Sequence, residues 1–225
     1  MISVPRLYPI VDAGCFANSD ELVSFTEQLA QAGCTLLQYR NKSGNARQTL
    51  EQARELRRRF LTHSKIANSA TLERGTLSSE GPRTVRLIMN DRADLALIAG
   101  FDGVHVGQDD LQPESVRKII GSNRWLGVST HNPEQLAEAE KTSADYVAIG
   151  PVFSTTSKDK PDPVVGLEGV RRARHLTRKP LVAIGGITRA NAVSVIEAGA
   201  DSVAVISDLL PDPRKSAEEL FRILR

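Results

Sequence analysis

The sequence predicts a parallel (β/α)8 barrel, a single α/β domain over residues 1–225 with an atypical insert at about 63–83. Short apolar runs alternate with longer amphipathic runs eight times, which indicates repeated βα units. Eight units in 225 residues leave roughly 28 residues per unit, near the lower limit for this barrel. An open doubly wound sheet is the competing architecture, but its dinucleotide-binding form needs a GxGxxG turn that the sequence lacks.

The strands are predicted at the short apolar runs. In chain order they are Leu7–Val11, Leu36–Arg40, Val85–Met89, Gly103–Val106, Trp125–Ser129, Tyr146–Ile149, Leu181–Ile184 and Ser202–Ile206.

The helices are predicted at the amphipathic runs, and start and stop signals support several of them. Pro113 and Pro133 follow Gln112 and Asn132, so each stands at a first helical position. A glycine stands where four helices should end, at Gly33, Gly100, Gly121 and Gly199. The predicted helices are Asp20–Ala32, Asn45–Leu61, Asp91–Ala99, Pro113–Ile120, Pro133–Lys141, Gly166–Leu176, Asn191–Ala198 and Ser216–Arg225.

The insert His63–Arg83 interrupts this rhythm between the second helix and the third strand. It carries Asn68, Ser69, Gly75, Ser78, Ser79, Gly81 and Pro82, and we predict an irregular segment. A helix-to-strand connection lies at the N-terminal face of a barrel, so we expect an exposed decoration or an interface element without a part in catalysis.

The composition excludes several classes of function. The 29 basic and 27 acidic residues give a net charge of +2, and aromatic residues make up 4% of the chain, so a nucleic-acid partner is not expected. Cys15 and Cys34 lie outside any CxxC spacing, and no apolar run has the ~20 residues of a membrane helix. The N-terminus leaves no room for a targeting peptide, and we expect a cytoplasmic protein. A homo-oligomer remains open.

Polar residues follow nearly every predicted strand, and in a barrel they would meet at the C-terminal mouth where active sites lie. Because side chains alternate along a strand, Gln38, Arg40 and Lys42 should share one face, and we expect Arg40 to bind an anion. Asp91 and Asp110 follow two neighbouring strands beside these cations. Capping of the following helices is the alternative, but two carboxylates in one mouth suit Mg²⁺.

Two further loops indicate phosphate binding. Gly185-Gly186 and Ser207 follow the seventh and eighth strands, where barrels commonly hold phosphate through backbone N–H groups. The loop Gly150–Gly166, which carries Lys158, is expected to act as a lid over the substrate. His105 alternates with apolar residues inside a strand, so an internal hydrogen-bonded role is favoured over catalysis. Together these features favour transfer chemistry in which a diphosphate leaves and the protein stabilises its charge.

At these residues the sequence resembles the thiamine phosphate synthase (thiamine-phosphate pyrophosphorylase) family, over the whole chain apart from His63–Arg83. Each matching segment is a weak signal alone, but their order and spacing are specific. The segments are Gln38–Lys42, Asn90–Asp94, Gly103–Asp110, Gly127–His131, Gly150–Phe153, Ala183–Ile187 and Val205–Ser207.

The resemblance implies an enzyme that joins 4-amino-2-methyl-5-(diphosphooxymethyl)pyrimidine to a thiazole phosphate, forming thiamine phosphate and diphosphate. It places Mg²⁺ on Asp91 and Asp110. Ser157 stands where the family usually has the second threonine of a Thr-x-Thr-Lys lid motif, and it retains a hydroxyl. The implied pyrimidine diphosphate ligands are Gln38, Arg40, Lys42, Asn90, Ser129 and Lys158; those of the thiazole phosphate are Thr155, Thr156, Ser157, Gly186, Ile206 and Ser207. Of these, Arg40, Lys42 and Lys158 would be the catalytic cations.

Two other functions stay open at this stage. A thiazole tautomerase of the same fold lacks much of the diphosphate and metal set, whereas this chain carries Lys42, Asp91, Asp110 and Lys158. A non-catalytic sensor of a phosphate ligand would not need the full set of charged residues at the mouth.

Overall fold

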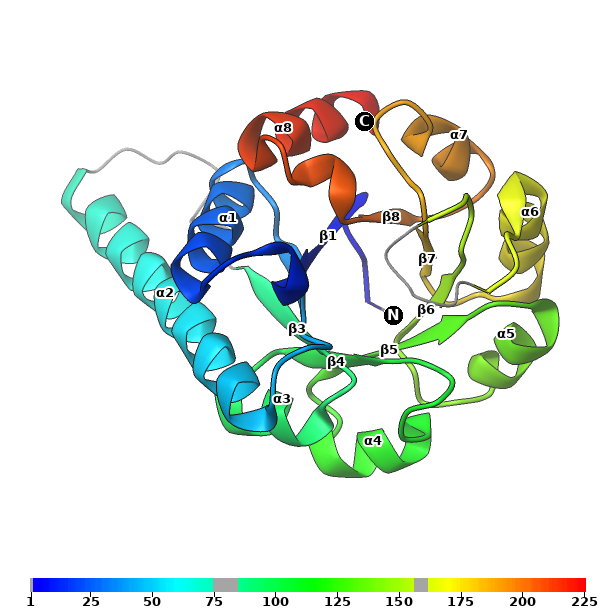
Figure 1. Ribbon diagram of the computed structural model, residues 1–225, viewed down its shortest axis with the longest axis horizontal. Helices are drawn as coiled ribbons and strands as arrows, with labels where there is room; N and C mark the ends of the chain where they lie inside the picture. The colour runs from blue at the N-terminus through cyan, green and yellow to red at the C-terminus, as the bar shows by residue number, and fades with distance from the viewer. Residues whose placement is uncertain (1, 75–84, 156–161) are drawn as a thin grey trace.

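The computed structural model describes residues 2–74, 85–155 and 162–225. Its eight strands form a closed barrel in chain order, each parallel to the next, and β8 pairs with β1 (Figure 1). The predicted (β/α)8 architecture is therefore confirmed. The strands are Leu7–Asp12 (β1), Leu36–Arg40 (β2), Arg86–Asn90 (β3), Gly103–Val106 (β4), Trp125–Thr130 (β5), Tyr146–Ile149 (β6), Leu181–Ile184 (β7) and Ser202–Val205 (β8).

Helices surround the barrel (Figure 1) and end at the glycines that the sequence indicated. Gly33, Gly100, Gly121 and Gly199 follow α1, α3, α4 and α7, all with positive φ. The helices are Ser19–Gln31 (α1), Ala46–Arg74 (α2), Ala93–Ala99 (α3), Pro113–Ile120 (α4), Pro133–Glu140 (α5), Gly166–Leu176 (α6), Ala192–Glu197 (α7) and Pro213–Ile223 (α8), with short 3-10 turns at Ala13–Cys15 (η1) and Ser207–Leu209 (η2).

Two helix predictions were wrong at one end. The second helix continues to Arg74 instead of stopping at Leu61, because no glycine or proline interrupts the chain between Ala46 and Gly75. Much of the predicted irregular insert is thus helical, and residues 75–83 of it lie outside the described residues. The last helix begins at Pro213, three residues before Ser216, because the Asp212 side chain caps it and accepts from Lys215 N.

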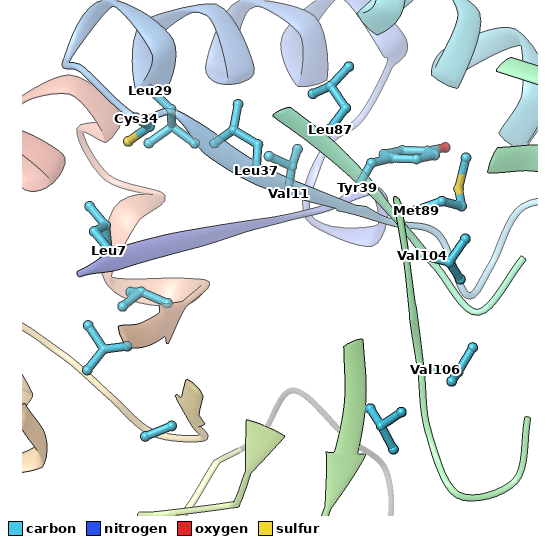
Figure 2. Close-up of a cluster of buried hydrophobic side chains, with 14 of the residues drawn as sticks. Leu7, Val11, Leu29, Cys34, Leu37, Tyr39, Leu87, Met89, Val104 and Val106 are labelled. Carbon is cyan, nitrogen blue, oxygen red and sulfur yellow. The ribbon is translucent and has the colours of Figure 1, made fainter. Parts of the chain in front are cut away.

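Alternation along each strand divides the core into two layers. Outward-facing side chains such as Leu37 and Val104 pack between the barrel and the helices (Figure 2). Inward-facing side chains such as Ile10 and Ile88 fill the barrel, and Ile2 and Val4 of the N-terminal segment pack against this inner layer. The inner layer and the N-terminal segment fill the barrel toward the amino ends of its strands, so the open end lies at the carboxyl ends.

Three aspartates fasten neighbouring strands at the opposite, N-terminal face. Asp102, Asp145 and Asp201 precede β4, β6 and β8. Each carboxylate accepts a backbone N–H at 2.7–2.8 Å from the first or second residue of the neighbouring strand β3, β5 or β7, and the donors are Leu87, Leu126 and Leu181 respectively. Each also pairs with an arginine from a surrounding helix. These contacts fix the strands far from the mouth.

We expect Asp145→Ala to lower the free energy of unfolding by about 1–3 kcal/mol, since the Leu126 N–H and the Arg117 guanidinium, each 2.7 Å from the carboxylate, lose a charged partner. Urea denaturation measures this loss. Glu138→Ala, which removes an exposed ion pair to Lys141, is the control and should change stability by less than about 0.5 kcal/mol. Equal effects in the two variants would contradict the fastening role.

Candidate active site

A cavity of about 390 Å³ opens at the carboxyl ends of the barrel strands. Eleven residues that the sequence analysis assigned to substrate or metal line it, namely Thr155 and ten others, while Thr156, Ser157 and Lys158 lie outside the described residues. The strand ends thus bring most of the predicted site together. The ten are Gln38, Arg40, Lys42, Asn90, Asp91, Asp110, Ser129, Gly186, Ile206 and Ser207.

Arg40 is fixed by a carboxylate that the sequence analysis did not single out. Asp12 ends β1 and is the register partner of Arg40 on β2, so the two side chains enter the barrel mouth side by side. The Arg40 guanidinium donates from Nη1 to Asp12 Oδ2, and both side chains are mostly buried. The remaining N–H groups of the planar guanidinium are then held in one orientation, which suits recognition of an anion.

Lys42, Asp91 and Asp110 form a charged cluster beside Arg40. Lys42 Nζ lies 2.5 Å from Asp91 Oδ2, and the Asp110 carboxyl contacts that of Asp91. Asp91 adopts a φ of 62°, a left-handed conformation that is uncommon outside glycine, and its N–H donates to His105 O at 2.7 Å. The backbone therefore departs from β3 in a strained turn that directs the carboxylate into the mouth.

Neither carboxylate caps a helix. The N-cap of α3 is Arg92, and that of α4 is Gln112, so the capping alternative was wrong for both. Asp110 Oδ2 instead accepts from Gly107 N at 2.8 Å within its own loop. Burial raises the pKa of the Asp110 carboxyl, and the neighbouring Asp91 carboxyl raises it further. A bound cation would stabilise the ionised forms of two carboxylates that lie this close together.

The residues fit a hard divalent ion that shares its ligands with substrate and water. Within residues 2–74, 85–155 and 162–225, no cluster of three or more His, Cys, Asp or Glu side chains could hold a metal ion alone. Mg²⁺ characteristically takes one or two carboxylates and completes its shell with water and substrate phosphate. Asp91 and Asp110 supply that number of carboxylates.

The turns after β7 and β8 face the cavity on the other side. Gly185 and Gly186 have φ values of 101° and 62°, and the Gly186 carbonyl accepts from Asn191 Nδ2 at 3.0 Å. A Cβ at Gly186 would lie 2.5 Å from the Ser154 carbonyl oxygen. The absence of a side chain therefore lets this turn approach the Phe153–Ser154 backbone closely. Ser207, which follows β8, is exposed and lines the same cavity.

The two ends of the predicted lid are joined to each other, and its first residues are held by the barrel. Val165 N donates to Pro151 O at 2.8 Å, Val152 N donates to Ile184 O of β7 at 2.9 Å, and His131 Nδ1 lies 2.6 Å from Gly150 O. His131 Nε2 also lies 3.5 Å from Asp162 Oδ2. The Gly150–Gly166 loop therefore begins and ends at the cavity, while its central residues 156–161 lie outside the described residues.

A buried set of hydrogen bonds, here called the interior chain, links Gln38, Tyr8, Tyr146, His105 and Ser129 at the inner end of the cavity, which all of them except Tyr146 line. Burial lowers the pKa of His105 to about 4 and raises the pKa values of both tyrosines. All three titratable members are therefore neutral at pH 7. The expectation that His105 is an internal hydrogen-bonded residue is confirmed.

Sequence reasoning missed Asp12, Tyr8, Tyr146 and His131. Asp12 and His131 carried a usable signal, since each is polar and lies at or just after the end of a strand. The tyrosines carried none, because an inward-facing tyrosine and an outward-facing one look alike until the strand register is known.

No helix within the described part of the chain is both long enough and apolar enough to cross a bilayer.

Comparison with known proteins gives a consistent family. The family model for thiamine monophosphate synthase matches residues 78–209. A thiamine-phosphate synthase of Koribacter versatilis is 54% identical over 226 residues, covering 99% of this chain and 97% of the relative, and that of Chloroflexus aurantiacus is 41% identical over 202 residues, covering 90% and 83%. The solved thiamine phosphate pyrophosphorylase from Pyrococcus furiosus has a TM-score of 0.77 at 31% identity, covering 97% of this chain and 95% of that one.

Proposed function

Because the chain belongs to the thiamine monophosphate synthase family, we propose that its cavity joins 4-amino-2-methyl-5-(diphosphooxymethyl)pyrimidine to a thiazole phosphate and releases diphosphate. The chain is an enzyme, and its product is thiamine phosphate. The observation that carries the proposal is the meeting of Arg40, Lys42, Asp91 and Asp110 in one cavity. Two cations beside two carboxylates suit a diphosphate bound together with a divalent ion.

The substrate ligands divide between the two sides of the cavity. Gln38, Arg40, Lys42, Asn90 and Ser129 lie on β2, β3 and β5 or just after them, and with Lys158 they are proposed to bind the pyrimidine diphosphate. The thiazole phosphate is assigned to the opposite turns, where backbone N–H groups can bind an anion. That second group is Thr155, Thr156, Ser157, Gly186, Ile206 and Ser207.

Asp91 and Asp110 are the residues that would hold Mg²⁺. When bound, the ion would add positive charge next to the leaving oxygens of the diphosphate. Lys42 stays beside the same carboxylates, and Arg40 is oriented by Asp12, so both cations are preorganised toward the charge that develops as the diphosphate departs.

The chemistry follows from electron donation by the substrate. The aminopyrimidine ring pushes electrons toward its exocyclic methylene carbon, the C–O bond breaks, and the electron pair leaves with the diphosphate. The thiazole nitrogen then donates its lone pair to the same carbon and forms the C–N bond. The carbocation between these steps must be protected from water, which is the role proposed for the Gly150–Gly166 lid.

The alternative functions make different products. A thiazole tautomerase would isomerise a thiazole phosphate and release no diphosphate, and a sensor would bind ligand without turnover. The purified chain should be incubated with both substrates and Mg²⁺, with diphosphate and thiamine phosphate measured together. Equal amounts of the two products, formed only when both substrates are present, support the proposal. Thiazole isomerisation without diphosphate, or binding without product, contradicts it.

The cytoplasmic location, the single-domain organisation, the absence of a nucleic-acid partner and any homo-oligomer stay predictions.

A further inference from the structure

The interior chain connects two proposed pyrimidine ligands that stand on different walls of the cavity. Gln38 is on β2 and Ser129 is on β5, and both line the cavity. Between them lie Tyr8, Tyr146 and His105, which are 1%, 0% and 7% exposed, and of these Tyr8 and His105 also border the cavity. A change at one end of the interior chain can therefore affect the other end through direct hydrogen bonds.

The donation of Gln38 Nε2 to Tyr8 Oη sets a direction for the other hydrogen bonds of the interior chain. Gln38 Nε2 donates to Tyr8 Oη at 3.2 Å, which leaves the single phenolic proton of Tyr8 to be donated to Tyr146 Oη, 3.0 Å away. In the same direction, the Tyr146 hydroxyl would donate to His105 Nδ1, 3.0 Å away. A neutral imidazole that accepts at Nδ1 carries its proton on Nε2, which donates to Ser129 Oγ at 2.8 Å.

This direction determines what the two ends offer to a ligand. One N–H of the Gln38 amide nitrogen is used inside the interior chain, and the amide Oε1 remains as an acceptor. Ser129 Oγ accepts from His105, so its own proton remains to be donated. The two ends of the interior chain consequently offer the Gln38 acceptor and the Ser129 donor, which match an aminopyrimidine, because that ring carries an amino N–H donor and a ring-nitrogen acceptor.

We propose that Tyr8, Tyr146 and His105 are positioning residues that hold Gln38 as an acceptor and Ser129 as a donor, and so select an aminopyrimidine over an oxopyrimidine. This inference rests on the proposed function. In the 4-oxo analogue an acceptor replaces the amino donor and the adjacent ring nitrogen carries a proton, so its pattern is reversed. Pairing two acceptors or two donors leaves buried polar groups unsatisfied, which discriminates strongly between such analogues.

The barrel interior is built around these contacts. A Cβ at Gly127 of β5 would lie 2.1 Å from Tyr146 Cζ and 2.4 Å from His105 Nδ1, so only glycine leaves room for the two rings to meet. Barrel interiors are usually filled by branched aliphatic side chains. A buried polar set that requires a glycine beside it stabilises the barrel less than such apolar packing would. Selection of the aminopyrimidine ring supplies a reason for its presence.

The first test reads the direction of the interior chain in the wild-type protein. Nitrogen-15 NMR at neutral pH distinguishes the two neutral tautomers and the imidazolium, and His105→Gln assigns the His105 signals by their loss. We expect His105 to be the Nε2–H tautomer, while the exposed His175 provides an internal reference. An Nδ1–H tautomer or a doubly protonated ring at His105 would overturn the inference.

The second test measures selectivity. Tyr146→Phe removes the donor to His105 Nδ1, which lets the imidazole accept from Ser129 and turns the serine proton away from the cavity. The kcat/KM ratio for the amino over the 4-oxo pyrimidine diphosphate should fall about tenfold, with the KM for thiazole phosphate unchanged.

Tyr39→Phe is the matched control for this substitution. Tyr39 is also a strand tyrosine, 1% exposed, but it faces outward and donates to Gln52 Oε1 at 2.6 Å. Its substitution should leave the ratio within twofold. An unchanged ratio in Tyr146→Phe overturns the inference. Should the wild-type chain release no diphosphate, the proposed function fails, and the His105 tautomer still decides the direction of the interior chain.

Discussion

Asp91→Asn and Asp110→Asn should each lower kcat roughly 100-fold and raise the Mg²⁺ concentration needed for half-maximal rate. Each substitution removes one negative charge from a carboxylate pair proposed to hold the ion. Asparagine is among the residues that tolerate a left-handed backbone, so the φ of 62° at position 91 remains accessible. At position 110 the amide oxygen can still accept from Gly107 N. The fold should therefore survive both changes.

Steady-state rates over a magnesium titration measure this effect, with circular dichroism to check the fold. Asp94→Asn is the matched control, because Asp94 lies three residues beyond Asp91, pairs with Arg92 and is absent from the cavity lining. Its turnover and magnesium dependence should stay within a few-fold of wild type. Wild-type rates at limiting magnesium in both Asp91→Asn and Asp110→Asn would contradict the metal assignment.

The sequence predicted the barrel and the location of the site because both depend on short-range patterns. Alternation places Gln38 and Arg40 on one strand face, and a polar residue just after a parallel strand lies at the mouth of any barrel. The pairs between strands are different. The Asp12–Arg40 contact depends on a register of β1 against β2 that no local pattern encodes, and the Lys42–Asp91 pair joins segments separated by the longest helix.

The errors have two origins. No glycine or proline stops α2 between residues 61 and 74, yet the Ser and Asn residues there suggested a loop when weighed one by one. Of the interior chain, the sequence indicated only His105 as an internal hydrogen-bonded residue. Its tyrosines come from β1 and β6, which are far apart in sequence and meet only once the barrel closes. Closure is a property of the whole fold, so these contacts cannot be inferred from one segment.

Substitutions on the two sides of the cavity should separate binding of the thiazole phosphate from stabilisation of the leaving diphosphate. Lys42→Ala and Lys158→Ala remove cations proposed to act mainly as charge develops, so both should lower kcat by about 10- to 100-fold with little change in the KM for thiazole phosphate. Gly186 is a poor choice on the other side, because a Cβ there would collide with the Phe153–Ser154 backbone at the start of the lid.

Ser207 offers a cleaner substitution, since it is exposed at the start of η2. Ser207→Asp places a carboxylate beside the proposed phosphate site, and like-charge repulsion should raise the KM for thiazole phosphate at least about tenfold while kcat changes less. Ser207→Ala retains the backbone N–H and should stay within about threefold of wild type. The measurement varies thiazole phosphate at saturating pyrimidine diphosphate. If the lysine variants and Ser207→Asp change KM and kcat in the same proportion, the diphosphate and the thiazole phosphate are not bound on separate sides of the cavity. In a shared site, every introduced or removed charge would act on both the diphosphate and the thiazole phosphate.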